Sequence, residues 1–180
     1  DTMLARAMLA AANVDKPEGR IVLARGVRAG DNVNAALVRN ARVAQSVLLE
    51  VDGECRLLSL NGAQLTPQAL ALDAGVHWTA AQWPPAPVVP STTDLRTAQA
   101  AVVAAQMAGA LKSVFDRTLQ YANERQQFGR PIGKFQAIQH QLAVMSEHVF
   151  AARMAAQLGC SGEGTTPDRL RVATAKARCS

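Results

Sequence analysis

The stretch YANERQQFGRPIGKFQ, residues 121–136, decides the fold of the second half of the chain. Its centre holds Gly129, Pro131 and Gly133, whereas helix-forming residues dominate on both sides. Proline interrupts a helix because it lacks the backbone N–H, and glycine weakens a helix because it loses the most backbone entropy. The stretch therefore predicts that one helix ends and a second begins within it.

Two long helices are predicted around this connection. From Leu95 to Glu124 only Gly109 interrupts residues that favour a helix. In the second helix, apolar residues recur at steps of three and four, which places them on one helix face. This apolar stripe consists of Phe135, Ile138, Leu142, Met145, Val149, Ala152 and Ala156. We expect a partial helical bundle, with breaks near residues 128–133 and 159–166.

A third helix is predicted to follow the second break. Glycines, the first of them Gly159, end the second helix. Thr166 is the predicted N-cap and Pro167 the first helical position of the third helix. The helix reaches Ser180 without a stop signal, so we expect the chain to be a piece of a longer protein.

The first half of the chain has a sequence pattern typical of short strands. Asp52-Gly53 and Asn61-Gly62 separate some of the apolar runs, and both pairs form tight turns because they tolerate positive φ. Short strands at this spacing predict a small antiparallel sandwich or barrel. The runs are Ile21–Leu23, Ala36–Val38, Val47–Val51 and Arg56–Leu60.

A proline-rich linker, WPPAPVVPSTTD at residues 83–94, separates the strand-like half from the helical half. Its four prolines exclude a helix and a central strand. We place the domain boundary here, with a β domain at residues 1–92 and a helical domain at 93–180. Thr93 or Asp94 is the predicted N-cap of the first long helix. The fold class is therefore α+β.

Composition narrows the kinds of ligand. The net charge is +5, but the basic residues are scattered and aromatics make up only 4% of the chain, which argues against nucleic acid and favours a phosphorylated small ligand. The three cysteines share no CxxC spacing, so we expect reduced thiols, no metal and a cytoplasmic protein. No uninterrupted apolar run reaches the roughly 18–20 residues of a membrane span.

The candidate site lies in the connection between the two long helices. It brings Arg125, Gln127, Phe128 and Gln136 to one end of the helix pair. A guanidinium presents a planar fork of donors that suits a phosphate. Spacing alone leaves open the common alternative that Arg125 caps the carbonyls at the end of its helix.

The same residues resemble the signature of the acyl-CoA dehydrogenases, in which Tyr-Ala-x-x-Arg-x-x-Phe-Gly is followed by Gln. The resemblance is specific over Val102–Arg153, fair as far as Lys176, and faint in the strand-like half, which corresponds to the family's middle β domain. It implies a C-terminal four-helix bundle that assembles as a dimer or tetramer, with the same chain or with a related one.

The resemblance also implies a cofactor and a reaction. FAD would lie at a subunit interface, with Arg125 on its pyrophosphate and Gln127, Phe128 and Gln136 in contact with it nearby. The implied activity is α,β-dehydrogenation of an acyl-CoA thioester, with FAD as the hydride acceptor.

Three departures from the family pattern keep other functions open. Gln99 stands where some members place the catalytic Glu, and Gln cannot act as a base. Ala100 replaces the neighbouring Arg, and Arg28-Ala29-Gly30 lacks the aromatic of the middle-domain element that faces the flavin. We therefore assign no catalytic residue to this chain. A non-catalytic partner subunit and a helical interaction module without flavin remain the alternatives.

Overall fold

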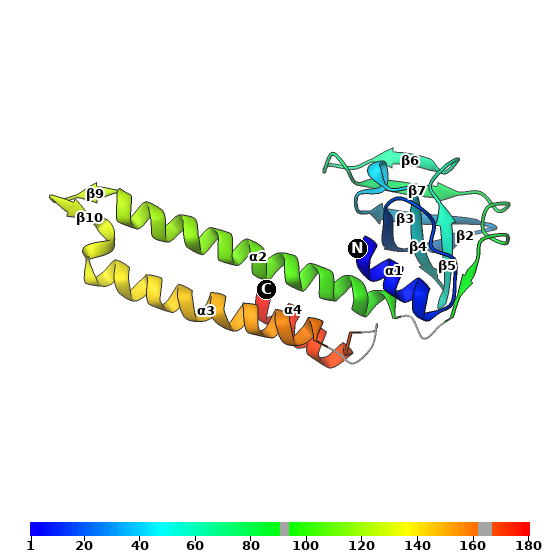
Figure 1. The fold of residues 1–180 in the computed structure, drawn as a ribbon. Helices are drawn as coiled ribbons and strands as arrows, with labels where there is room; N and C mark the ends of the chain where they lie inside the picture. The colour runs from blue at the N-terminus through cyan, green and yellow to red at the C-terminus, as the bar shows by residue number, and fades with distance from the viewer. Residues whose placement is uncertain (91–93, 162–166) are drawn as a thin grey trace. The chain divides into compact units, whose positions relative to one another are not determined.

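The computed structural model describes residues 1–90, 94–161 and 167–180. These residues form two compact units, a β unit that comprises Asp1–Gln99 and a helical unit from Ala100 onward. Figure 1 shows the elements of each unit in chain order. The predicted boundary between residues 92 and 93 lies outside the described residues.

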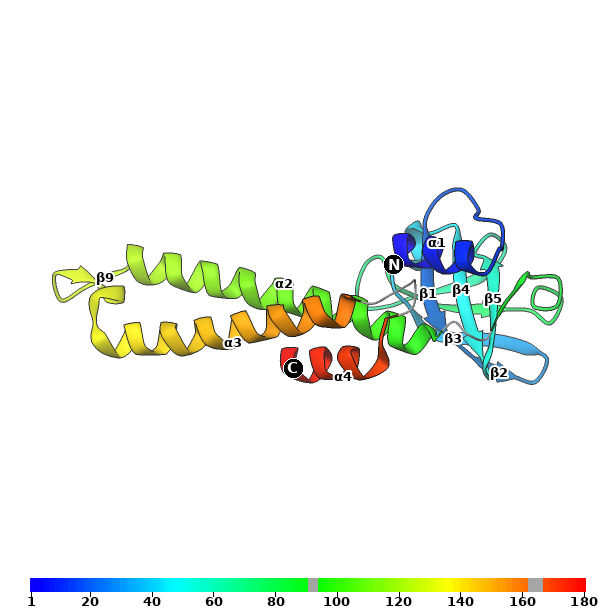
Figure 2. The same cartoon turned by 60° about the horizontal axis from the view of Figure 1, so that its bottom comes forward.

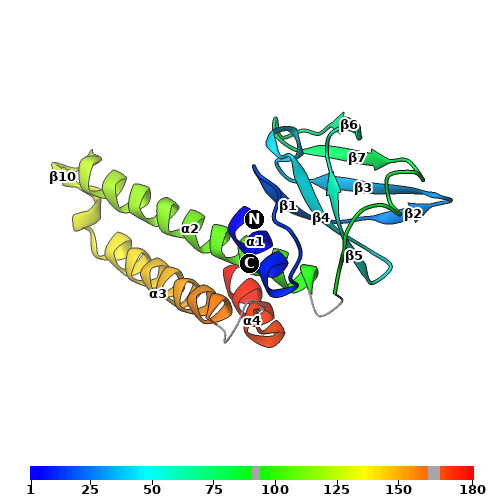
Figure 3. The ribbon, with the colours of Figure 1, turned by 45° about the vertical axis from the view of Figure 1, so that its right-hand side comes forward.

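The β unit contains two four-stranded sheets (Figure 3). The first has the order β1-β4-β5-β8 and the second the order β2-β3-β7-β6. The elements are α1 (Thr2–Ala11), β1 (Ile21–Arg25), β2 (Val27–Ala29), β3 (Asn32–Val38), η1 (Ala41–Val43), β4 (Ser46–Val51), β5 (Glu54–Ser59), β6 (Gln64–Pro67), β7 (Ala74–Trp78) and β8 (Val88–Val89).

The antiparallel prediction is confirmed with one exception. β1 pairs with β4 in parallel, because the chain passes through β2, β3 and η1 before it returns to the first sheet in the same direction. The other strand pairs of both sheets are antiparallel. Asp52 and Gly53 form the predicted turn between β4 and β5, with φ values of 52° and 80°, as a type I′ hairpin requires.

Strands β1 and β4 are buried on both faces, which explains their continuous apolar runs. Side chains alternate across a strand, so one set faces the second sheet and the other set faces α1. Val22, Val47 and Leu49 join the core with the second sheet. Ile21 and Leu48 join a separate core with α1.

The proline-rich linker is part of the β unit. Its Val88–Val89 segment forms β8 at the edge of the first sheet, a place that tolerates nearby prolines. Arg56 donates hydrogen bonds to the carbonyls of Trp83 (3.2 Å), Pro84 (2.8 Å) and Ala86 (2.8 Å). Trp83 is buried in the core between the sheets, so this part of the linker is held against the β unit.

The helical unit is a long helical hairpin with a shorter helix against it. Figures 1 and 2 show α2 and α3 running side by side, and α4 along the C-terminal part of α3. The predicted break near residues 128–133 is confirmed, whereas residues 162–166 of the second break lie outside the described residues. The elements are α2 (Leu95–Glu124), of which the part up to Gln99 belongs to the β unit, β9 (Gln126–Gln127), β10 (Arg130–Pro131), η2 (Ile132–Lys134), α3 (Gln136–Cys160) and α4 (Arg169–Cys179).

The predicted N-cap is confirmed for α2 but not for α4. Asp94 accepts a hydrogen bond from the N–H of Thr97 (2.9 Å) and caps α2. The prediction of Thr166 as the N-cap of α4 is wrong. That residue lies outside the described residues, and the N-cap is Asp168, whose carboxylate accepts from the N–H of Arg171 (2.8 Å).

The predicted apolar stripe of α3 faces the interior of the helical unit. Val149, Ala152 and Ala156 are buried, and the residues nearer the start of α3 are half-buried. α3 ends at Cys160, one residue after Gly159, in agreement with the prediction. Gly159 lies where α4 approaches closely, and a Cβ on it would stand 2.9 Å from the Cβ of Ala175.

One of the described helices, α2, is long and apolar enough by length and composition to cross a membrane. Its most apolar 18-residue window has a mean hydropathy of 1.2, and 22% of that window is buried. A bundle helix meets the same criterion, so the absence of a membrane span stays a prediction.

Candidate functional site

The connection between α2 and α3 forms a two-stranded hairpin at the tip of the helical unit. Gln127 pairs with Arg130, and Gln126 pairs with Pro131. The N–H of Ile132 donates to the carbonyl of Arg125 (2.8 Å), which extends the ladder by one step. The loop is therefore only two residues long.

Phe128 and Gly129 form this loop with φ values of 52° and 77°, the left-handed pattern of a type I′ turn. A bulky side chain is strained in this region, because its Cβ approaches the following carbonyl oxygen. The ring of Phe128 is also 91% exposed. An exposed aromatic ring on a strained backbone is more typical of a binding site than of a core.

Aromatic packing ties the hairpin to the start of α3. The rings of Phe128 and Phe135 lie edge to face, with their centroids 6.1 Å apart. Phe135 is the N-cap residue of α3 and immediately precedes Gln136. The structure thus places Arg125, Gln127, Phe128 and Gln136 at one end of the helix pair, as predicted, while their role in cofactor binding stays a prediction.

Arg125 directly follows α2. Its N–H donates to the carbonyl of Tyr121 (2.8 Å), but in the described part of the chain its guanidinium makes no hydrogen bond or ion pair. The alternative that Arg125 caps helix carbonyls therefore has no contact to support it. An exposed guanidinium without a partner remains available to an anionic ligand.

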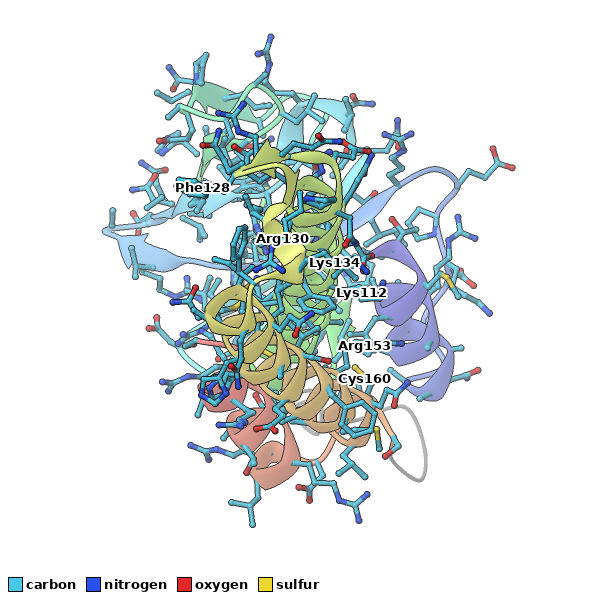
Figure 4. The ribbon with its side chains drawn as sticks, turned by 90° about the vertical axis from the view of Figure 1, so that its left-hand side faces the viewer. Lys112, Phe128, Arg130, Lys134, Arg153 and Cys160 are labelled. Carbon is cyan, nitrogen blue, oxygen red and sulfur yellow. The ribbon has the colours of Figure 1, made fainter. Side chains whose placement is uncertain are left out.

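Arg130 is not among the residues predicted from the sequence. Its guanidinium carbon lies 4.2 Å from the centroid of the Phe135 ring, within the range of a cation–π interaction. Figure 4 looks onto the hairpin and shows Arg130 and Phe128 at this tip. The signal that identifies Arg130 is its position directly after the Phe-Gly turn, which sets it opposite Gln127.

A groove of about 330 Å³ lies between α2 and α3, away from the hairpin. Small residues of both helices line it together with Lys112 and Arg153, which Figure 4 labels, and Lys112 also pairs with Asp116. Small side chains on facing helices leave this space, so the helix pair is not packed to the density of a closed core. The lining residues are Ala105, Ala108, Gly109, Lys112, Arg153, Ala156, Gln157 and Cys160.

The residues that depart from the family pattern have structural contacts in the β unit. The amide of Gln99 donates to the carbonyl of Leu23 (2.8 Å), which ties the first turns of α2 to β1. Arg28 pairs with Asp52 (3.4 Å) and lies over the ring of Trp83 (5.1 Å). Both side chains therefore stabilise the β unit through these contacts.

Metal and thiol chemistry find no support among the described residues. No group of three or more His, Cys, Asp or Glu side chains there is arranged to hold a metal ion. Burial, with a smaller contribution from Glu50, raises the pKa of the Cys55 thiol to about 12. A thiol with such a pKa stays protonated and is a poor nucleophile.

Comparison with known proteins identifies relatives of the helical unit. The family model of the acyl-CoA dehydrogenase C-terminal domain matches residues 96–180. The short/branched chain specific acyl-CoA dehydrogenase of Bos taurus is 48% identical over 52 residues, which are 29% of this chain and 12% of that protein. The acyl-CoA dehydrogenase IpdE2 of Mycobacterium tuberculosis is 37% identical over 81 residues, which are 45% of this chain and 24% of that protein.

Solved structures match nearly the whole chain in fold. A Tcur3481-Tcur3483 steroid ACAD variant superposes with a TM-score of 0.74 at 22% identity, over 98% of this chain and 59% of that one. The ChsE4-ChsE5 complex from Mycobacterium tuberculosis gives 0.69 at 21% identity, over 98% and 58%. A glutaryl-CoA dehydrogenase from Mycobacterium smegmatis in complex with FADH2 gives 0.63 at 14% identity, over 90% and 52%. This chain thus covers little more than half of each of these three structures.

Proposed function

The chain belongs to the acyl-CoA dehydrogenase family, whose C-terminal domain occupies residues 96–180, and we propose that the full-length protein is an FAD-dependent acyl-CoA dehydrogenase. The proposed reaction is the α,β-dehydrogenation of an acyl-CoA thioester. The observation that carries the proposal is the exposed guanidinium of Arg125 at the start of the hairpin, which has no hydrogen-bond or ion-pair partner among the described residues.

The donors at the tip fit the pyrophosphate of FAD. A pyrophosphate carries two negative charges, and Arg125 offers a fork of N–H donors while Gln127 and Gln136 offer amide donors. The exposed ring of Phe128 offers an apolar surface to the cofactor beside them. When bound, FAD would supply the hydride acceptor of the reaction.

The tip cannot enclose a cofactor by itself, because all four of these side chains are exposed. A second surface must cover the other side of FAD and exclude water from it. We assign that surface to another subunit, in agreement with the oligomers formed by relatives such as the ChsE4-ChsE5 complex. The proposed assembly is a homo- or hetero-oligomer, a dimer or a tetramer.

The catalytic base is proposed to lie outside this chain. The base must remove a proton from the α-carbon, and the amide of Gln99 has no basic atom for that role. Gln99 is also engaged with the carbonyl of Leu23. This chain therefore contributes cofactor contact and assembly rather than proton transfer.

These same observations favour a second candidate function. A partner subunit would retain the hairpin and the bundle, while a different chain supplies the base. Gln99 and the missing aromatic after Arg28 both fit this role. In that case the oligomer is heteromeric, and acyl-CoA turnover requires both chains.

Helix α2, the groove beside it and the location of the protein are also part of the proposal. We propose that α2 is a bundle helix rather than a membrane span, because Ala104, Ala108 and Ala122 along it are already buried in the described structure. The groove between α2 and α3 leaves surface for further helices of the assembled domain. The location is proposed to be cytoplasmic, with the three cysteines reduced.

Retention of FAD by the full-length protein tests the proposal. Replacing Arg125 with Ala should weaken FAD binding by roughly ten- to a hundredfold, since a charge-assisted hydrogen bond contributes about 1.5–3 kcal/mol. Arg125→Lys keeps the charge but loses the fork, so an intermediate loss is expected. Fluorescence titration of the apoprotein measures each dissociation constant.

Arg117→Ala is the matched control, since Arg117 is an exposed arginine of α2 away from the hairpin. It should bind FAD like the wild type. Equal affinity in wild type and Arg125→Ala would reject the flavin site. Reduction of bound FAD by acyl-CoA thioesters then separates the two candidates, because a partner subunit alone should show none.

A further inference from the structure

The hairpin carries a second arginine whose position is set by an aromatic ring. The guanidinium of Arg130 stacks over Phe135, with 4.2 Å between the guanidinium carbon and the ring centroid. Phe128 packs edge to face with the same Phe135 ring, with 6.1 Å between the ring centroids, and so helps to hold that ring in place. The contact with Phe135 restricts where the Arg130 side chain can lie, which reduces the entropy that it loses when it binds a ligand.

Strand register places Arg130 beside the predicted cofactor residues. It pairs directly with Gln127, and residues that oppose each other in a ladder project from the same face. Arg125 directly precedes β9, and its carbonyl accepts a hydrogen bond from the N–H of Ile132, so it lies at the base of the same ribbon. One face of the ribbon therefore carries Gln127 and Arg130, with Arg125 at its base.

Nothing in the described part of the chain neutralises these two cations. Neither guanidinium has an acidic partner there, whereas Arg28 and Arg56 of the β unit both do. Two like charges on one short hairpin repel each other, which destabilises the hairpin until an anion lies between them. A ligand with two adjacent negative groups satisfies both.

We propose that Arg130 is a second phosphate-binding residue of the FAD site and that Phe135 is its positioning residue. This inference rests on the proposed function, because it assigns the second cation to the same pyrophosphate as Arg125. Each phosphate of the pyrophosphate would then have its own guanidinium, with the amide of Gln127 between them.

The test is the affinity of the full-length apoprotein for FAD, measured at several salt concentrations. Arg130→Ala should weaken binding by roughly ten- to a hundredfold, the same range as Arg125→Ala, because it also removes one charge-assisted contact. It should also make FAD binding less sensitive to salt, because one fewer ion contact remains for salt to screen. A purely structural role would change affinity without changing the salt dependence.

Three further variants refine the assignment. Arg130→Lys keeps the charge, so it should retain the salt dependence while binding FAD more weakly than the wild type. Phe135→Leu keeps an apolar side chain but removes the ring, and it should produce a smaller loss in the same direction as Arg130→Ala. Lys134→Ala removes an exposed cation of the same tip that the proposal does not use, and it should bind like the wild type.

The outcomes separate this inference from the proposed function. If Arg125→Ala loses FAD and Arg130→Ala does not, the inference is wrong and the proposed function stands. If neither variant loses FAD, both are wrong. An equal loss of FAD affinity in Arg130→Ala and Lys134→Ala would show that Arg130 acts only through the overall surface charge, which would overturn the inference. If Arg130→Ala fails to fold, Arg130→Lys decides, since unchanged FAD affinity in that variant overturns the inference.

Discussion

Phe128 is the residue whose conformation is hardest to explain by folding alone. Its backbone has a φ of 52° and its ring is 91% exposed, so it combines strain with a lack of burial. A residue held in this way contributes little to the stability of the helical unit. Its value lies in what covers the ring, which under the proposed function is FAD and the neighbouring subunit.

Replacing Phe128 with Asn should leave the stability of the 180-residue chain nearly unchanged. Asn tolerates the left-handed region, and relief of about 1 kcal/mol of strain offsets the loss of roughly 0.5–1.5 kcal/mol from the contact with Phe135. Urea unfolding monitored by circular dichroism measures the difference. A loss well above about 2 kcal/mol would show instead that the ring is needed for folding.

The cysteines differ in reactivity because they differ in burial. Cys160 is exposed, whereas Cys55 and Cys179 are buried, and burial raises the pKa of both buried thiols. A thiol reagent at pH 8 should modify Cys160 in the native chain and the other two only after unfolding. Mass spectrometry of the labelled chain identifies the sites. Rapid modification of Cys55 under native conditions would contradict its burial in the β unit.

The Cys55 thiol also predicts a pH dependence of stability. Its pKa rises from 9.0 to about 12 on folding, so the unfolded chain releases the proton at a lower pH than the folded chain. The stabilisation is complete below pH 9 and is lost as the pH rises toward about 12. Unfolding midpoints measured from pH 8 to 11 should fall faster for the wild type than for Cys55→Ala.

Helix packing in the helical unit depends on one close approach. Gly159 of α3 faces α4, and an added Cβ would stand 2.9 Å from Ala175 and 3.4 Å from the carbonyl of Arg171. Real Cβ atoms do not tolerate the shorter distance, so α4 must move if a methyl group is added. By contrast, a Cβ on Gly109 of α2 meets no atom within 4 Å.

Gly159→Ala should therefore destabilise the chain by about 1–3 kcal/mol, the usual cost of overpacking. Gly109→Ala is the matched control, and it should stabilise α2 by up to about 1 kcal/mol, because alanine favours the helix. Chemical denaturation of the 180-residue chain measures both. A destabilising Gly109→Ala would indicate that another helix already covers this position.

At the scale of the whole molecule, α3 carries a row of exposed apolar side chains that we propose as an assembly surface. The predicted stripe faces inward, so it is not this surface. The outer α3 stripe consists of Phe150 (64% exposed), Met154 (42%) and Leu158 (56%), which lie four residues apart on one helix face. Exposed apolar residues that form a continuous row are typical of a subunit interface.

The full-length protein should therefore form a dimer or tetramer, and the double substitution Phe150→Asp and Leu158→Asp should shift it toward the monomer. Two buried charges oppose association, because each loses its hydration at the interface. Light scattering measures the mass. Val27→Asp is the control, since Val27 is 64% exposed but lies in the β unit. An unchanged mass in the double variant would place the interface elsewhere.

Local sequence determined much of this protein. The 121–136 connection, the helices around it, the stripe of α3 and the Asp52-Gly53 hairpin were predictable, because each depends on residues within a few positions of one another. The family resemblance was likewise carried by one continuous motif. Where a cap depends on fine local geometry, the prediction failed, since Asp168 rather than Thr166 supplies the oxygen for the N–H of Arg171.

Only the tertiary structure decided how distant segments meet. The parallel pairing of β1 with β4, the edge strand β8 in the linker and the approach of α4 to Gly159 each join residues far apart in the chain. The same holds for the stacking of Arg130 on Phe135, which depends on the register of the hairpin and on where α3 begins. Pairing and packing follow from the free energy of the whole fold, which local periodicity does not contain.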